Sequence, residues 1–182
     1  MEKLLKDGRL FKLLEKVDWD IAQAAHEEVC RYCGGKLDCG NYTRKPRGGP
    51  RWDKRYSFDC SRCRKRKTPP SVRFLGRRVY VGVVVVLVSA MMHGLAPHRV
   101  ERLRQELGID EHTLKRWRAW WLETFVQNGF WKGARARFMP SLNEKAMPLS
   151  LVEAFGTNRE GLRKLLEFLS PITVPGKGVA AM

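Results

Sequence analysis

Acidic residues are scarce in this chain of 182 residues, which holds 19 Asp and Glu against 35 Lys and Arg. No aspartate occurs after Asp110, and beyond Glu111 and Glu123 the remaining carboxylate side chains are Glu144, Glu153, Glu160 and Glu167. Two-metal phosphoryl transfer needs carboxylates clustered on a rigid scaffold, so this distribution argues against a nuclease centre. The sequence also has no glycine-rich nucleotide loop, no HExxH motif and no nucleophile elbow. We therefore expect a protein that is not an enzyme.

Long apolar segments are absent as well. The longest, Val79–Met92, spans about 14 residues, whereas a helix that crosses a bilayer needs about 18–20. Met1–Leu14 is charged throughout and lacks the apolar stretch of a signal peptide. These features predict a buried helix over Val79–Met92, a cytoplasmic location and no membrane partner. In a reducing compartment, paired cysteines favour a metal ion over disulfides.

The positive charge is concentrated in one part of the sequence. Residues 29–80 hold 16 basic and three acidic residues, a net charge of +13, whereas residues 1–28 have a net charge of −2. The whole chain has a net charge of +16 and a pI near 10.1. This balance indicates a polyanionic partner, because a solvated charge run rarely reaches such a density.

Four of the five cysteines form two CxxC pairs, Cys30 with Cys33 and Cys60 with Cys63. Each pair can present two thiolates to one ion, and two pairs supply the four tetrahedral sulfur ligands that Zn²⁺ prefers. A thioredoxin-like redox motif would need a βαβ context, and nothing else in the sequence suggests an iron–sulfur protein. The pattern predicts one structural Zn²⁺ with no open position for chemistry.

The segment that contains these pairs should fold as a zinc ribbon with a short antiparallel sheet. Alternating residues predict strands over Leu37–Thr43 and Arg55–Asp59, joined by a loop rich in Pro and Gly. Tyr56 and Phe58 are expected to pack that sheet. Cys39 is expected to be an unpaired thiol on a strand and His26 a surface residue, neither of them a ligand.

Helical patterns surround this ribbon. We expect four segments: N-terminal helices over 1–28, the zinc ribbon over 29–76, a helix-turn-helix over 77–129, and a C-terminal helical extension and tail over 130–182. The fold class is therefore small α+β, with a four-cysteine zinc ribbon followed by a mostly helical region. Within the first segment, Asp18 is expected to cap a second short helix that continues to Glu28.

The helix-turn-helix prediction is based on capping signals. Pro97 suits the first turn of one helix, Gly108 its end, and Asp110 the N-cap of a following helix, Glu111–Asn128. An ordinary helical hairpin is the alternative. In a helix-turn-helix the second helix enters the major groove. The residues expected to reach bases or phosphates there are His112, Thr113, Lys115, Arg116 and Arg118.

A second group of expected nucleic-acid contacts lies in the ribbon and its loop. Its members are basic and are interleaved with aromatic residues such as Tyr32, Tyr42 and Trp52, which can stack on unpaired bases. These basic residues are Arg44, Lys45, Arg47, Arg51, Arg62, Arg64, Lys65, Arg66 and Lys67.

The order of these features resembles a known family. The sequence continues from two CxxC pairs through a basic strand and a hydrophobic helix to Leu107-Gly108-Ile109, and then to Thr113, Arg116 and Trp117. This order is similar to that in the N-terminal DNA-binding region of bacterial insertion-sequence transposases. The likeness covers about residues 29–122. In that family a DDE or DDD nuclease domain follows, and its acidic residues have no counterpart after Asp110. The resemblance implies the DNA-binding half without the cutting half.

From the charge, the cysteines and this resemblance we expect a non-catalytic protein of mobile-element type. It would bind double-stranded DNA for end recognition or regulation, in the bacterial nucleoid, with a recombinase or transposase as a partner protein. Two alternatives remain open. One is an RNA-binding or ribosome-associated zinc ribbon. The other is a protein–protein adaptor that uses apolar residues of the C-terminal helices, among them Trp120, Phe125, Phe130, Trp131, Phe138 and Phe155.

Overall fold

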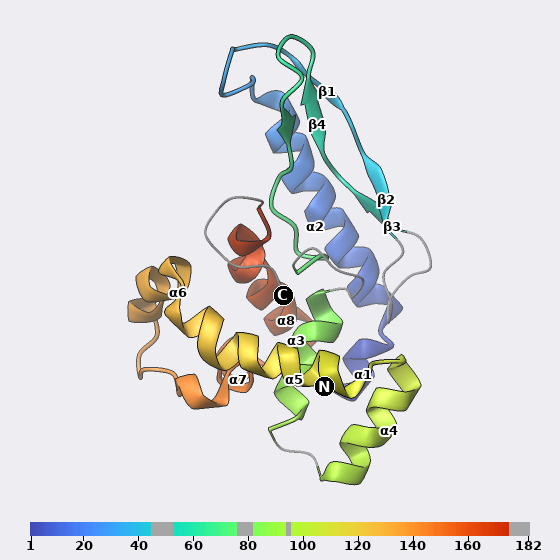
Figure 1. Cartoon of the computed structure of the whole chain (residues 1–182), viewed down its shortest axis with the longest axis vertical. Coiled ribbons are helices and arrows are strands. Elements are labelled where there is room, and N and C mark those ends of the chain that lie inside the picture. Colours follow the sequence, from blue (N-terminus) through green and yellow to red (C-terminus); the bar gives the residue numbers. More distant parts are fainter. Residues whose placement is uncertain (45–52, 76–81, 94–95, 175–182) are drawn as a thin grey trace.

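The computed structural model describes residues 1–44, 53–75, 82–93 and 96–174, which form a small α+β protein (Figure 1). This agrees with the predicted fold class at that level. Four residues singled out from the sequence, Lys45, Arg47, Arg51 and Trp52, lie outside the described residues.

The N-terminal segment consists of a short helix, α1 (Glu2–Leu5), and a long helix, α2 (Gly8–Glu27). The Asp7 carboxylate caps α2 by accepting hydrogen bonds from the N–H groups of Arg9 and Leu10. The predicted helix start at Asp18 is wrong, because α2 continues through it without a break. No glycine or proline interrupts the sequence between positions 9 and 27, so nothing stops the helix there.

Five short strands follow among the described residues, and all of their pairings are antiparallel. One sheet has the order β1-β4-β5 and the other pairs β2 with β3. The strands are β1 (Leu37–Cys39), β2 (Tyr42–Arg44), β3 (Asp53–Arg55), β4 (Phe58–Cys60) and β5 (Arg66–Lys67).

Each of the two strands predicted from the sequence is therefore divided in two. At the division, Ser57 donates its N–H to Oδ1 of Asn41 and its hydroxyl to the carbonyl of Gly40. The Asn41 side chain thus takes the place of a backbone partner, and the ladder is interrupted at this point.

The remaining helices form a body below the sheets (Figure 1). They are α3 (Gly82–Met91), α4 (Pro97–Leu107), α5 (Glu111–Ala119), a π-helical turn η1 (Trp120–Phe125), α6 (Gly129–Ala134), α7 (Leu149–Phe155) and α8 (Arg159–Leu169), with 3₁₀ turns η2 (Arg135–Arg137), η3 (Glu144–Ala146) and η4 (Ser170–Thr173). The helix predicted over Glu111–Asn128 begins as expected but changes to π geometry at Trp120, and α2 is longer.

Helix α3 lies at the centre of the body, and every one of its ten residues is buried. The prediction of a buried apolar helix is confirmed over Gly82–Met91, while residues 76–81 lie outside the description. None of the described helices is long and apolar enough to span a bilayer.

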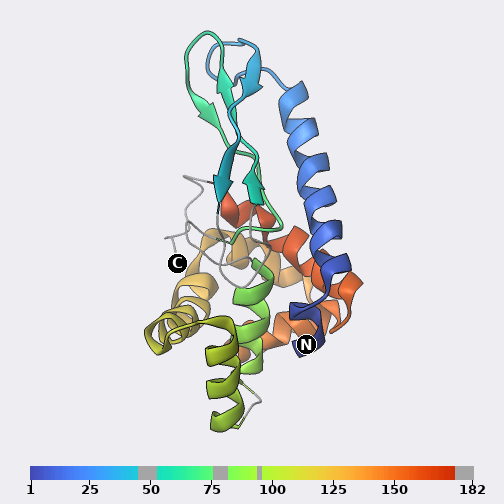
Figure 2. The same ribbon diagram turned by 90° about the vertical axis from the view of Figure 1, so that its right-hand side faces the viewer.

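The described residues have two hydrophobic cores, and α2 contributes to both. Leu10 and Leu14 from its first half belong to the large core of the helical body. Ala22 and Ala25 from its second half pack with Leu37 and other residues of the sheet in the smaller core. Figure 2 shows α2 running beside both parts. The N-terminal helix is therefore a shared support rather than a separate unit.

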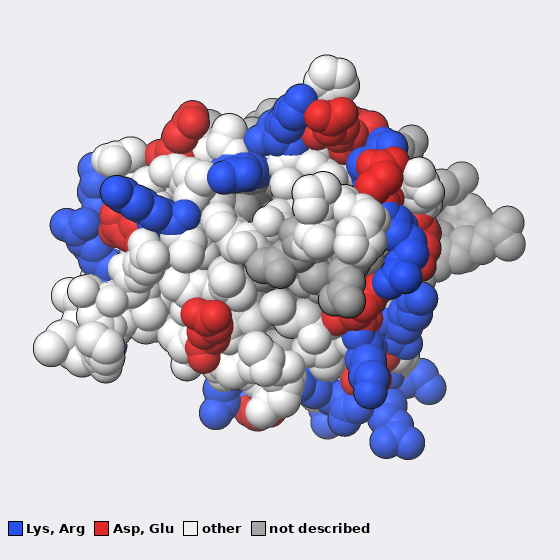
Figure 3. All heavy atoms as spheres, turned by 90° about the horizontal axis from the view of Figure 1, so that it is seen from below, with Lys and Arg blue, Asp and Glu red and all other residues white. Residues whose placement is uncertain are grey.

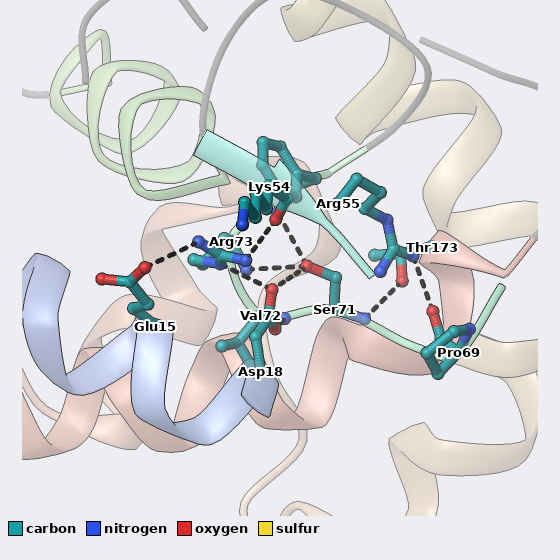
Figure 4. Close-up of polar contacts among 10 residues, drawn as sticks. Glu15, Asp18, Lys54, Arg55, Pro69, Ser71, Val72, Arg73 and Thr173 are labelled. Atoms are coloured by element: carbon teal, nitrogen blue, oxygen red, sulfur yellow. Dashed lines mark hydrogen bonds and ion pairs between the residues drawn. The ribbon is translucent and has the colours of Figure 1, made fainter. Parts of the chain in front are cut away.

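Between the two cores lies a buried ion pair, Asp18 with Arg73 (Figure 4). Asp18 is only 1% exposed. Its Oδ2 accepts hydrogen bonds from Arg73 Nε at 2.8 Å and from the Ser71 hydroxyl at 2.6 Å, and its Oδ1 accepts one from the Val72 N–H at 2.6 Å. Arg73 also donates to the Lys54 carbonyl, which connects the pair to β3.

The aromatic residues that motivated the adaptor hypothesis lie inside the protein. Trp120, Phe125 and Trp131 are buried in the large core, and the other three pack against it. Phe138, for example, lies edge-on to Phe155 with 5.9 Å between the ring centroids. These side chains therefore provide packing rather than an open apolar surface.

We expect Asp18→Asn to lower the free energy of unfolding by about 3 kcal/mol, because it removes the buried negative charge that is hydrogen-bonded to the Arg73 guanidinium. Urea unfolding followed by far-ultraviolet circular dichroism measures this loss. Glu15→Gln is the matched control, since Glu15 is exposed and lies 3.9 Å from the same guanidinium. If both variants unfold at the same urea concentration, Asp18 does not stabilise the junction.

Candidate metal centre and nucleic-acid interface

The four paired cysteines lie close together in two turns, residues 30–36, which follow α2, and residues 60–65, which join β4 to β5. We call these two turns the tip, because they lie at the upper end of the molecule in Figure 1. The four sulfur atoms all lie within 4.8 Å of one another. The closest pairs cross between the two motifs: Cys30 and Cys63 are 3.6 Å apart, and Cys33 and Cys60 are 3.4 Å apart. A tetrahedral zinc with Zn–S bonds of about 2.3 Å separates its sulfurs by about 3.8 Å. The cluster is therefore compatible with such an ion.

The two CxxC turns have the same backbone hydrogen bonds. In the first, the Cys30 N–H donates to the Gly35 carbonyl and the Gly34 N–H to the Cys30 carbonyl. In the second, the Cys60 N–H donates to the Lys65 carbonyl and the Arg64 N–H to the Cys60 carbonyl. Gly34 and Arg64 occupy matching positions with φ of +67° and +59°. The turns thus present their sulfurs in the same way from opposite sides.

Gly35 makes close approach of the two turns feasible. A Cβ atom at this position would lie 2.9 Å from the Cys60 sulfur and 3.4 Å from the Cys33 sulfur. A side chain would therefore displace ligand atoms.

The thiols have unequal acidities. The Cys63 N–H donates to the Cys60 sulfur at 3.4 Å, and this hydrogen bond is the main reason that the pKa of Cys60 is lowered to about 6. The pKa of Cys63 is raised to about 11, because burial and the neighbouring cysteine sulfurs outweigh a hydrogen bond from the Lys65 N–H. Four thiolates in such a space need a cation to balance their charge.

Part of the smaller core lies directly beneath the cysteines. Tyr56 and Phe58 are buried there, as predicted. His26 is not a surface residue as expected, because its ring stacks on Phe58 at 4.9 Å and its Nε2 bonds to the Leu37 carbonyl at 2.9 Å. Cys39 is exposed on β1 and lies outside the cluster. Among the described residues, the four paired cysteines are the only group of this kind that could hold a metal ion.

The basic residues expected to bind nucleic acid fall into two groups at the tip. Arg62, Arg64 and Lys65 are exposed, and none forms an ion pair with a described residue. Arg66 instead pairs with Asp59, and Lys67 with Glu28.

A further member of the expected set is partly withdrawn from solvent. Arg44 is half-buried and lies over the rings of Tyr42 and Phe74, at 5.8 and 5.5 Å from the ring centroids. Two exposed cations that the sequence reasoning missed, Arg31 and Lys36, lie next to the cysteine turns. Their sequence positions close to Cys30 and Cys33 could have identified them as candidate contacts.

Tyr32 is an exposed aromatic at the same tip, with 53% of its surface accessible. The Lys65 ammonium lies 3.9 Å from its ring centroid and the Arg31 guanidinium 4.7 Å. This places an apolar ring directly among cations, at the outer end of the metal-binding turns.

The α4–α5 segment has the caps expected for a helix pair. Pro97 is in the first turn of α4, and Gly108 ends it with φ of +61°. Asp110 caps α5 by accepting hydrogen bonds from the N–H and hydroxyl of Thr113, which lower the pKa of Asp110. Thr113 is buried in this cap, so the structure removes it from the expected contact surface.

The other predicted contacts on α5 are exposed. Lys115 forms an ion pair with Glu111 at 2.7 Å, and Arg116 donates to the Thr113 hydroxyl at 3.2 Å. His112 and Arg118 make no ion pair with a described residue. Figure 3 views the end of the molecule opposite the tip, where Lys and Arg side chains lie around the rim with carboxylates between them. Cations and carboxylates thus alternate on this face.

Comparisons of this chain with models of protein families, with curated proteins and with solved structures find no match.

Replacing one cysteine of the cluster should greatly weaken metal binding. Structural zinc in small peptides contributes about 10–16 kcal/mol, so losing one of four ligands corresponds to an affinity loss of roughly 100-fold or more. We expect this for Cys60→Ser, measured by competition with a zinc chelator. Cys39→Ser is the control and should bind one zinc ion as the wild type does. Equal affinities of both variants would show that the cluster is not the metal centre.

Gly35→Ala should also weaken zinc binding, because the added methyl group would lie against two ligand sulfurs. Arg64→Gly is the contrasting variant: it removes an L residue from a positive-φ position and should leave zinc affinity unchanged. The same chelator competition measures both. A wild-type affinity in Gly35→Ala would contradict the packing argument.

Proposed function

We propose that this chain is a non-catalytic DNA-binding protein whose contact tip is folded around one structural zinc ion. The observation that carries the proposal is the charge of that tip. Five exposed cations without ion pairs among the described residues surround the four cysteines: Arg31, Lys36, Arg62, Arg64 and Lys65.

A metal-stiffened turn makes such a charge cluster effective. Cations that are already held in place lose little conformational entropy when they meet phosphates, and neutralising phosphates releases counterions. Four cysteine ligands would fill the coordination sphere of zinc, so the ion would have a structural role and would not bind a substrate. The two CxxC turns and the antiparallel strands beneath them support the interpretation as a zinc ribbon.

We further propose that α4 and α5 act as a helix-turn-helix. In support, the two helices are joined by a turn with a left-handed Gly108, Asp110 caps the second helix, and Leu114 and Trp117 anchor that helix in the core. His112, Arg116 and Arg118 remain exposed for contact with DNA.

The tip and α5 lie toward different ends of the long axis of the molecule (Figure 1). A duplex that contacts both would therefore follow that axis. The tip would supply contacts to the phosphate backbone, and α5 would supply contacts in the major groove. This division would give the tip mainly affinity and α5 mainly sequence preference.

The biological role that fits these contacts is of mobile-element type, as the sequence resemblance implies. The protein would recognise element ends or regulate a partner recombinase or transposase. An RNA-binding role is the second candidate, and one observation favours it: Tyr32 is exposed between cations and could stack on an unpaired base.

The tip can be tested by removing three of its charges. We expect the triple variant Arg62→Gln, Arg64→Gln, Lys65→Gln to bind duplex DNA more weakly at low salt. The slope of log affinity against log salt should become less steep by about 2.7, since each phosphate contact contributes about 0.9. Fluorescence anisotropy with a labelled duplex over a salt series measures both quantities.

The control removes the same charge elsewhere, through Lys12→Gln, Lys16→Gln and Lys132→Gln, all at exposed positions away from the tip. It should alter the slope much less. If the wild-type protein binds no duplex at low salt, the DNA proposal fails. A clear preference for single-stranded RNA in direct competition, lost in Tyr32→Ala, would favour the second candidate.

A further inference from the structure

A small pocket lies between the C-terminal end of α3, the C-terminal end of α5 and the residue that follows η3. Its lining residues are Ser89, Met92, His93, Arg118 and Met147. The space that the centre of a water-sized group can occupy is about 10 Å³, which suits one such group. No carboxylate is among the lining residues.

Ser89 gives this pocket a polar group that needs a partner. The residue is only 3% exposed, and its hydroxyl oxygen has no hydrogen-bond partner among the described residues. A buried hydroxyl without a partner is costly, so an occupant that accepts its hydrogen bond would be stabilised.

The other two polar residues that line the pocket are His93 and Arg118. The carbonyl of Met147 can only accept a hydrogen bond, so His93 Nε2, at 2.9 Å from it, carries a hydrogen and the ring is held at the pocket. Arg118 is exposed and forms no ion pair with a described residue. It therefore offers an uncompensated charge to whatever enters.

We infer that this pocket receives one oxygen of a phosphate group of the DNA backbone. The inference rests on the proposed function. The Ser89 hydroxyl would donate to that oxygen from the buried side, and Arg118 would supply the charge. The C-terminal end of α3 carries about half a negative charge, which the full charge of Arg118 outweighs.

The size of the pocket favours a phosphodiester over a free ion. Only one oxygen fits, so the rest of the group stays outside, as it would for a phosphate attached to a strand. Arg118 also belongs to α5, the helix proposed to lie against the duplex. A water molecule could accept the hydrogen bond of the Ser89 hydroxyl, but it would not neutralise the charge of Arg118.

The test uses the full zinc-loaded chain with Ser89→Ala and Arg118→Gln. We expect each variant to bind duplex DNA about ten-fold more weakly than wild type, and the double variant to lose less than the product of the two. The salt slope should fall by about one in Arg118→Gln and stay unchanged in Ser89→Ala, because only the first removes a charge. Arg137→Gln, which removes an exposed charge away from the pocket, is the control.

A second arm separates the two sources of phosphate. Inorganic phosphate is added while the Nε–Hε resonance of Arg118 is followed by nuclear magnetic resonance. No shift at millimolar phosphate together with weakened DNA binding supports the backbone assignment. A shift that Ser89→Ala abolishes, with DNA binding unaffected, would overturn it in favour of a free-anion site.

Two further results distinguish failure of the inference from failure of the proposed function. If Ser89→Ala binds DNA as wild type does, the pocket receives no phosphate oxygen and the inference is overturned. The proposed function would still stand if the tip variant loses binding. If the wild-type protein binds no DNA, both fall.

Discussion

The buried pair of Asp18 and Arg73 is the interaction on which the arrangement of this protein depends. It lies where α2 passes from the helical body to the cysteine tip, and its hydrogen bonds join the helix to residues 71–73 and to β3. Both oxygens of the carboxylate have partners, so the desolvation cost of the two charges is offset by directed contacts. A hydrophobic pair could stabilise this junction as well, but it would lack the directed hydrogen bonds that orient α2 relative to residues 71–73 and β3.

The junction matters because the tip has little else to support it. Its core consists of a few apolar side chains such as Ala22, Leu37 and Phe58, together with the cysteines themselves. A core of this size cannot offset the conformational entropy of a Gly-rich and Lys-rich segment, so a bound metal ion would supply much of the missing stability. Helix α2 fixes the tip relative to the helical body, since its two halves belong to different cores.

What the sequence could predict was local. The spacing of Cys30, Cys33, Cys60 and Cys63, the stop at Gly108 and the cap at Asp110 depend on neighbouring residues, and the structure has each of them. The prediction for Asp18 is wrong because the local sequence does not distinguish an aspartate that caps a helix from a buried aspartate in an ion pair. The partner in that pair, Arg73, is 55 positions away in the sequence. The divided strands and the π-helical turn also depend on tertiary contacts, which periodicity does not encode.

The same distinction applies to the charge. The sequence predicts a strongly basic segment, but its composition does not tell which cations are already paired. The fold pairs Arg66 and Lys67 with carboxylates and packs Arg44 on aromatic rings, while the cations next to the cysteines stay exposed. The unpaired charge is thereby brought to the part of the chain that a metal ion would make rigid. Exposed cations held on such a scaffold would meet the phosphates of the proposed partner with little loss of conformational entropy.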